Sequence, residues 1–305
     1  MNVTLVRACL RDGRGGSPTA VLDDGPLTDE QRRAVPVRAG TSHAVFLSTG
    51  PTSADAGTAE ISLRFFTSEG ELPGCGHGTV AALAVLADRT GTREVTVRTP
   101  AGALRGRAVR HPNGELEAWF APGPVTLRAP RNGEHEDVLA ALGLAADTPG
   151  AVIASLGRPR LLLPLPTRSA LAALTPDPDR LRAACDRPAL LGCYLYSAPT
   201  PDGRVAARMF APSIGVPEDI ANANSTACLA AHLAREGLPG VTADMGDALG
   251  TPATIKAVAV PGPDGPEIRV GGTAKITDEP AQDTPGTPHR PTDRTTHSTA
   301  DLPPP

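Results

Sequence analysis

Cys75 and His77 lie in a glycine-rich loop directly before an apolar segment, residues 80–87. That segment is apolar on every side, which predicts a helix buried in the core. The first turn of such a helix presents unpaired N–H groups and the positive end of the helix dipole, so it can hold a small anion and lower the pKa of a nearby thiol. The alternative is a glycine-rich turn before a core helix, and the spacing alone does not choose between them.

The same construction occurs a second time along the chain. Arg64-Phe65-Phe66 precedes the first loop, and Arg208-Met209-Phe210 precedes a second loop, 216–226, which runs into an Ala/Leu-rich segment, 227–234. A repeat at this long spacing indicates two similar lobes rather than a solenoid. Two buried helices whose N-terminal loops face each other would form one site at the lobe junction, where pockets are common.

Composition narrows the function classes. The chain has 305 residues, enough for two domains, with 29 basic and 33 acidic residues and only 3% aromatics. The absence of a basic cluster and of stacking aromatics argues against a nucleic-acid partner. Five irregularly spaced cysteines without a C-x-x-C pair indicate neither a zinc ribbon nor a dithiol redox motif. With no signal-like segment and no membrane-spanning run, we expect a soluble cytoplasmic protein without a membrane partner.

Local patterns predict strands alternating with a few helices. A capping box at Thr28 and Gln31 predicts a helix over 29–35 that ends near Pro36. Asp202-Gly203 is typical of a hairpin turn. The expected strands are 2–8, 19–22, 43–48, 60–66, 94–98, 103–109, 116–120, 152–156, 160–163, 192–198, 205–210, 254–260 and 267–270, with short helices at 168–174 and 180–185. We divide the chain into an N-terminal lobe at 1–117, a C-terminal lobe at 118–276 and a disordered Pro/Thr-rich tail at 277–305.

Several motifs in the right order resemble the PhzF family, phenazine-biosynthesis isomerases within the diaminopimelate-epimerase-like fold. The resemblance covers roughly residues 1–276 and is carried by 16–22, 64–67, 71–73, 75–79, 208–212, 218–219 and 268–274. It implies an α+β fold of two pseudo-symmetric lobes, each a mostly antiparallel sheet wrapped around a central buried helix, with the site between them. It also implies cofactor-independent proton transfer on a small carboxylated substrate, in a homodimer.

The resemblance assigns catalytic roles to individual residues. His43 stands where the family has its glutamate base, and imidazole, with an ordinary pKa of about 6.5, suits proton transfer near neutrality. The alternative is a strand histidine without a role. His77 matches a substrate-contacting histidine, or else a helix-start histidine bonded to backbone. Asp219 matches an aspartate that orients the substrate, and Gly76 would donate its N–H to the substrate carboxylate.

The second loop departs from the family pattern. The usual Pro-Ala-Thr-Gly-Ser after the aspartate is here Ile-Ala-Asn-Ala-Asn, residues 220–224. Asn222 and Asn224 still form hydrogen bonds, but the backbone freedom of the glycine is lost, which indicates a substrate of different shape. The substrate-binding residues carried over from the resemblance are Ser17, Gly76, Gly78, Asn222, Ala223, Asn224 and Ser225.

Cys75 supports a rival chemistry. Related racemases and epimerases use two cysteines, one in each loop, on opposite faces of a substrate carbon. Cys75 matches the first, but the second position is Asn222, which carries no proton at neutral pH, and Cys228 lies further into the helix. A one-thiol epimerase or dehydratase is therefore the alternative, while a buried, inert cysteine is the structural default.

Three functional hypotheses follow. The preferred one is an isomerase in which His43 removes a proton and a double bond moves, acting in antibiotic-type metabolism, with a 4-alkylproline precursor as one candidate substrate. The second is the Cys75-based epimerase, racemase or dehydratase, and the third is a catalytically silent small-molecule-binding homologue. No metal site, nucleotide loop or flavin signature is visible in the sequence, so we expect no cofactor.

Overall fold

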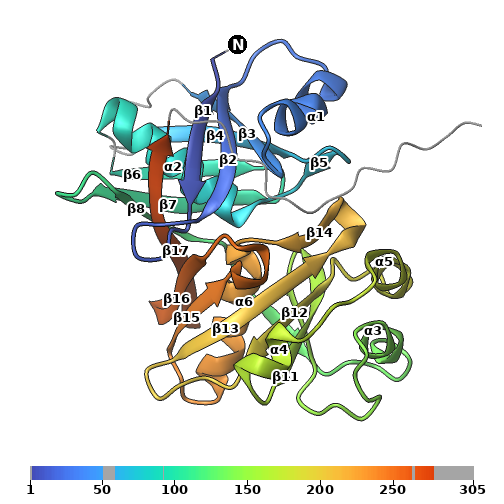
Figure 1. The fold of residues 1–305 in the computed structure, drawn as a ribbon. Coiled ribbons are helices and arrows are strands. Elements are labelled where there is room, and N and C mark those ends of the chain that lie inside the picture. The colour runs from blue at the N-terminus through green and yellow to red at the C-terminus, as the bar shows by residue number, and fades with distance from the viewer. Residues whose placement is uncertain (1, 51–58, 92, 263–264, 278–305) are drawn as a thin grey trace, which may run out of the picture.

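The computed structural model describes residues 2–50, 59–91, 93–262 and 265–277 and shows the expected α+β fold, dominated by strands (Figure 1). The helices are α1 (Asp29–Arg38), α2 (Gly76–Thr90), α3 (Glu136–Ala141), α4 (Arg168–Ala172), α5 (Pro178–Asp186) and α6 (Ala223–Arg235), with 3-10 turns η1 (Pro212–Ile214) and η2 (Asp247–Leu249). No helix within these ranges is long and apolar enough to cross a membrane. Apart from Thr277, the predicted tail lies outside the described residues.

The strands confirm most of the predicted pattern. They are β1 (Thr4–Ala8), β2 (Ser17–Asp23), β3 (His43–Thr49), β4 (Ala59–Phe66), β5 (Glu71–Leu72), β6 (Glu94–Thr99), β7 (Gly102–Arg110), β8 (Leu116–Ala121), β9 (Thr126–Arg128), β10 (Val152–Leu156), β11 (Arg158–Leu165), β12 (Cys193–Ser197), β13 (Arg204–Ala211), β14 (Val216–Asp219), β15 (Gly240–Met245), β16 (Ala253–Gly262) and β17 (Gly265–Thr277). The predicted lobe boundary between residues 117 and 118 falls inside β8, so this division stays a prediction.

Helix α1 begins where the sequence predicts, but it ends later than predicted. The Thr28 side chain accepts from the backbone N–H of Gln31, and the Gln31 side chain accepts from that of Thr28, as the capping box predicts. The predicted end near Pro36 is wrong, because the helix continues to Arg38. Pro36 is buried beside Val35, so packing of this turn outweighs the one backbone hydrogen bond that proline removes.

Two helices lie at the centre of the core. Residues 76–86 of α2 are all buried, as the apolar segment predicts, and the helix packs against β1, β2, β3, β4, β7, β8 and β17. Helix α6 packs against β10, β15, β16 and β17. Helix α2 ends at Thr90 and is capped by Gly91, whose positive φ of 69° suits glycine.

The repeat read from the sequence has a structural counterpart. Strand β4 pairs antiparallel with the short β5, and the chain then forms α2 and returns as β6, parallel to β4. In the same order, β13 pairs antiparallel with β14, followed by α6 and by β15, parallel to β13. A two-pronged ion pair joins the first two strands of each unit, Arg64 to Glu71 and Arg208 to Glu218.

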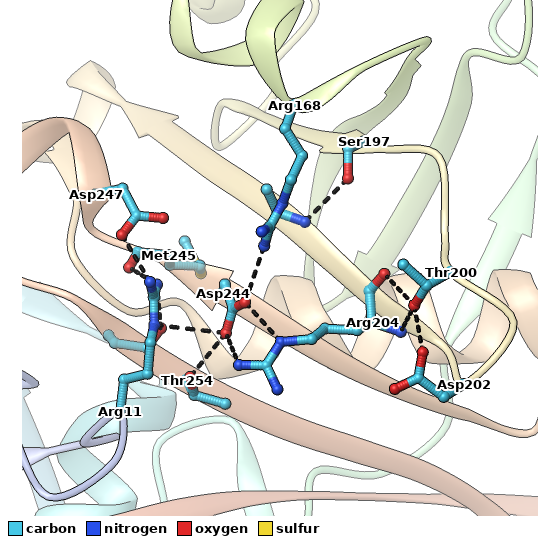
Figure 2. Close-up of polar contacts among 12 residues, drawn as sticks. Arg11, Arg168, Ser197, Thr200, Asp202, Arg204, Asp244, Met245, Asp247 and Thr254 are labelled. Atoms are coloured by element: carbon cyan, nitrogen blue, oxygen red, sulfur yellow. Dashed lines mark hydrogen bonds and ion pairs between the residues drawn. The ribbon is translucent and has the colours of Figure 1, made fainter.

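The buried carboxylate of Asp244 links the loop between β1 and β2, which contains Arg11, to the repeat unit formed by β13, β14, α6 and β15. Asp244 on β15 is 3% exposed and forms ion pairs with Arg11, Arg168 and Arg204 (Figure 2). Thr254 also donates to it. Burial alone would raise the pKa of Asp244, but the hydrogen bonds from Arg204 and Thr254 and the charge of Arg11 lower it. The carboxylate therefore stays charged and joins segments far apart in sequence.

Candidate active site

A cavity of about 380 Å³ lies among the loops that precede α2 and α6 and the β10–β11 hairpin. Its volume falls within the range of small-molecule pockets. The polar side chains that line it include His43, Cys75, His77, Asp219, Asn222, Asn224, Arg158 and Arg160. All four residues predicted to be catalytic are therefore brought together, although they come from separate parts of the chain.

The N-termini of α2 and α6 abut at Gly76. A Cβ atom at this position would lie 2.6 Å from the Ala223 Cβ and 3.0 Å from the Asn224 backbone nitrogen. Only glycine permits this approach. Asn222 caps α6 by accepting from the Ser225 N–H at 2.9 Å, whereas the N-cap residue of α2, Cys75, makes no side-chain cap. The first turn of α2 thus keeps its backbone donors for the site.

Cys75 and His77 form a thiol–imidazole couple. The Cys75 Sγ lies 3.5 Å from His77 Nε2, and His77 Nδ1 lies 2.7 Å from the Ala221 carbonyl oxygen. Since a carbonyl only accepts, Nδ1 carries a proton and donates it. In the neutral ring Nε2 is consequently the basic nitrogen, and it faces the thiol. The couple has the geometry by which a histidine activates a cysteine.

His43 begins β3 and contacts His77 edge to face, with ring centroids 4.4 Å apart and an interplanar angle of 86°. Its Nδ1 lies 2.8 Å from the Ser42 hydroxyl. Burial, together with the neighbouring His77 charge, lowers the pKa of His43 well below its ordinary value. The pKa of about 6.5 assumed from the sequence is therefore wrong, because the ring is 2% exposed. His43 is a neutral proton acceptor at pH 7.

His77 has the opposite protonation preference. Burial acts to lower its pKa, but the charges of Cys75 and Asp219 and the hydrogen bonds to Cys75 and Ala221 raise it to about 10. A neutral imidazole and an imidazolium thus lie side by side. Two titratable groups whose environments drive their pKa values apart are the pattern of a base paired with an acid.

Asp219 supports the imidazolium from the second loop. Its Oδ2 lies 4.0 Å from His77 Nδ1 and accepts from Asn222 Nδ2 at 3.0 Å, while Oδ1 accepts from the Ala221 N–H at 3.4 Å. Burial raises the pKa of Asp219, and the His77 charge and the Asn222 hydrogen bond oppose that rise. With both oxygens accepting, the geometry is that of an ionised carboxylate.

Four residues predicted to bind substrate do not line this cavity: Ser17, Gly78, Ala223 and Ser225. Ser17 is fully buried, and a Cβ at Gly78 would point at the Val45 and Cys75 side chains. Ala223 packs on Gly76, and the Ser225 hydroxyl accepts from Arg160. Their substrate-binding roles stay predictions. Arg158 and Arg160, which line the cavity, were not singled out from the sequence.

His43, Cys75 and His77 also form a group of metal-ligand type. Their ligand atoms lie within 4.8 Å of one another, and all three residues are buried. Imidazole and thiolate are zinc ligands, and the Ala221 carbonyl on His77 Nδ1 resembles the outer contact of a metal-bound histidine. A metal here would use the same atoms as the Cys75–His77 couple, so metal binding and proton transfer compete.

Comparison with known proteins places the chain in a family. Residues 11–279 match the model of the family described as "Phenazine biosynthesis-like protein". An uncharacterised isomerase of Deinococcus radiodurans is 34% identical over 88% of this chain and 89% of its own length. The trans-2,3-dihydro-3-hydroxyanthranilate isomerase of Pseudomonas aeruginosa is 30% identical over 72% of this chain and 75% of its own length.

Solved structures agree in fold. A predicted epimerase from Pseudomonas aeruginosa superposes with a TM-score of 0.74 at 27% identity, covering 90% of this chain and 96% of that one. A probable proline racemase from Agrobacterium radiobacter, only 13% identical, shares the fold with a TM-score of 0.58, covering 90% and 91% of the two chains. With the family model matching most of its length, the chain belongs to the phenazine biosynthesis-like family and is an isomerase of the PhzF type.

Proposed function

We propose that the protein is a cofactor-independent isomerase that moves a proton, and with it a double bond, in a small carboxylated, amino-acid-derived compound of specialised metabolism. The observation that carries the proposal is the pair of adjacent histidines, His43 with a lowered pKa and His77 with a raised one, inside a single cavity. Neutral His43 removes a proton from one carbon of the substrate, and charged His77 donates a proton to another.

The remaining lining residues hold the substrate. Asn222 and Asp219 form one hydrogen-bonded unit at the start of α6, and Asn224 lines the same wall. The uncapped first turn of α2 offers the Gly76 N–H to a substrate oxygen. The repeated strand–strand–helix–strand unit supports two pseudo-symmetric lobes, each built around one helix, with the substrate between them.

The relatives and the changed loop guide the choice of substrate. Relatives from Pseudomonas are named trans-2,3-dihydro-3-hydroxyanthranilate isomerases. In this chain the 220–224 loop lacks the family glycine. A substrate of related chemistry but different shape, such as a 4-alkylproline precursor, is therefore part of the proposal. The family resemblance also supports a homodimer, which sedimentation equilibrium would test.

Proton NMR in D₂O tests the proposed reaction. The protein is incubated with trans-2,3-dihydro-3-hydroxyanthranilate and with unsaturated, alkyl-substituted proline precursors, and ligand binding is measured alongside. We expect deuterium at one carbon and migration of an olefinic signal for at least one of these compounds. A compound that binds in the cavity but exchanges no proton would instead support a silent binding homologue.

A second candidate function rests on the Cys75–His77 contact of 3.5 Å. In this alternative the thiol, activated by Nε2, acts as the base of a one-thiol epimerase or dehydratase. It predicts inversion or loss of a leaving group without double-bond migration, and rapid inactivation by iodoacetamide. The isomerase is favoured because relatives of this chain are named isomerases and because a second base, the neutral His43, lines the same cavity.

A further inference from the structure

Arg160 on β11 is a buried cation that has no carboxylate partner among the residues the structure describes. It is 2% exposed, yet it forms no ion pair with any residue in the described ranges. Arg32, the other buried arginine in those ranges, lies 2.8 Å from Asp24. Buried charges in proteins are normally paired, because an uncompensated one is strongly destabilising. Arg160 therefore has a charge that no residue in the described part of the chain neutralises.

The hydrogen bonds of Arg160 do not neutralise that charge. Nη1 donates to the Ser225 hydroxyl at 3.0 Å, and Nη2 donates to the Arg158 carbonyl oxygen at 3.1 Å. Both acceptors are neutral, and the buried Nε has no partner among the described residues. Because a guanidinium has five N–H groups, most of its donor capacity is not used by the described residues.

The position of Arg160 points to a ligand. Arg160 lines the same cavity as the two histidines. Arg158, two residues earlier on β11, lines it as well, and side chains two apart on a strand share one face. Ser225 belongs to the first turn of α6, so the guanidinium lies against the positive end of that helix. Asp219, which also lines the cavity, is already engaged by Asn222 and lies beside His77.

We propose that Arg160 binds the carboxylate of the substrate. This inference rests on the proposed function, in which the substrate is a small acid that occupies this cavity. The guanidinium supplies a charged, directional anchor beside the 220–224 loop, whose sequence departs from the family pattern. The acidic group then sits at the β11 wall, and the reacting carbon lies in the space between Arg160 and the histidines.

A pair of probes of nearly equal shape tests the anchor without requiring turnover. The dissociation constants of 2-aminobenzoate and 2-aminobenzamide are measured by calorimetry for wild type, Arg160→Met, Arg160→Lys and Arg33→Gln. The last variant is the control, since it removes one positive charge from an exposed residue of α1 outside the cavity. We expect the wild type and the control to prefer the acid at least tenfold, Arg160→Met to lose this preference, and Arg160→Lys to keep part of it.

Two results would overturn the assignment. One is a wild type without preference for the acid, whether or not either probe binds. The other is an Arg160→Met protein whose preference for the acid is unchanged, which would indicate that the helix N-termini bind the carboxylate instead. Thermal unfolding without ligand adds a separate readout. We expect Arg160→Met to unfold at the same or a higher temperature than wild type, because an unpaired buried charge is removed; a clear drop would indicate a structural role instead.

The inference and the proposed function can fail separately. If proton exchange is absent while the acid preference depends on Arg160, the anchor stands and the isomerase chemistry is wrong. If exchange is present but Arg160→Met leaves KM for the exchanging acid unchanged, the anchor is wrong and the chemistry stands. With both correct, Arg160→Met raises KM at least tenfold and changes kcat less.

Discussion

Replacing Asp219 by asparagine should lower the pKa of His77. The Asp219 Oδ2 lies 4.0 Å from His77 Nδ1, and both side chains are buried. Two unit charges at this distance interact by about 4 kcal/mol at an effective dielectric constant of about 20, equivalent to roughly 3 pH units. The pKa of His77 rises from 6.5 to about 10 against the effect of burial, and the charge of Cys75 contributes more to this rise than the charge of Asp219. We therefore expect a drop of about 1–2 pH units, where one unit corresponds to roughly 1.4 kcal/mol.

NMR of the imidazole ring measures this drop directly. The His77 resonances are assigned by their loss in His77→Gln and are then titrated in wild type and Asp219→Asn. Asparagine keeps the shape of the side chain while removing its charge, so the comparison isolates the electrostatic effect. The double variant with Cys75→Ser should lower the pKa of His77 further, since the two neighbours act together.

An unchanged His77 pKa in Asp219→Asn would refute this reasoning. It would mean that the carboxylate does not hold the imidazolium, and the case for His77 as the proton donor would lose its electrostatic basis. A fall in kcat without that pKa change would assign Asp219 to substrate orientation alone.

Four further outcomes follow from the structure. Folding lowers the pKa of His43, so on acidification the imidazole is protonated in the unfolded chain before it is protonated in the folded one. The free energy of unfolding should therefore decrease below about pH 6.5. Urea unfolding should show a smaller decrease for His43→Gln than for wild type. Gly76→Ala should abolish activity and destabilise the protein, since its Cβ would meet the Ala223 Cβ at 2.6 Å, and kinetics with thermal unfolding would check both. Zinc chloride should inhibit the wild type reversibly and Cys75→Ser much more weakly, whereas EDTA should leave the activity of the purified protein unchanged. Asp244→Asn should lower the free energy of unfolding by about 2–4 kcal/mol at pH 7, as measured with urea. The difference from wild type should disappear at a pH below the lowered pKa of Asp244, where the wild-type carboxylate is protonated as well.

The sequence was most informative where local rules decide the structure. The capping box fixed the start of α1, and the apolar run at 80–87 predicted the buried α2. The sequence does not predict the short elements β5, β9, β14 and α3, because each offers too few residues for a periodic pattern; residues 216–219, expected in a loop, form β14. The sequence also does not predict strand β15, because the arginines that pair with its charged residue, Asp244, are distant in the chain.

For the site, too, the sequence predicts some features and not others. Motif resemblance identified His43, Cys75, His77 and Asp219, and the structure brings their side chains to one cavity. The pKa of His43 was not predictable, since it depends on burial and on a ring from another element. Arg160 was missed because an arginine in a strand is ordinarily a solvated residue, and only the fold reveals its burial. In the sequence, the only indication of a special role for Arg160 is that it lies two residues after Arg158 in a strand that is otherwise apolar.

The most direct test of the central claim is a comparison of His43→Gln with Cys75→Ser in the D₂O exchange assay, using the compound that the wild type isomerises. His43 as the general base predicts that His43→Gln slows exchange by about 10²–10⁴-fold, while Cys75→Ser stays within about tenfold of wild type. The reverse order, with exchange lost in Cys75→Ser and retained in His43→Gln, would contradict the account and assign the reaction to the thiol.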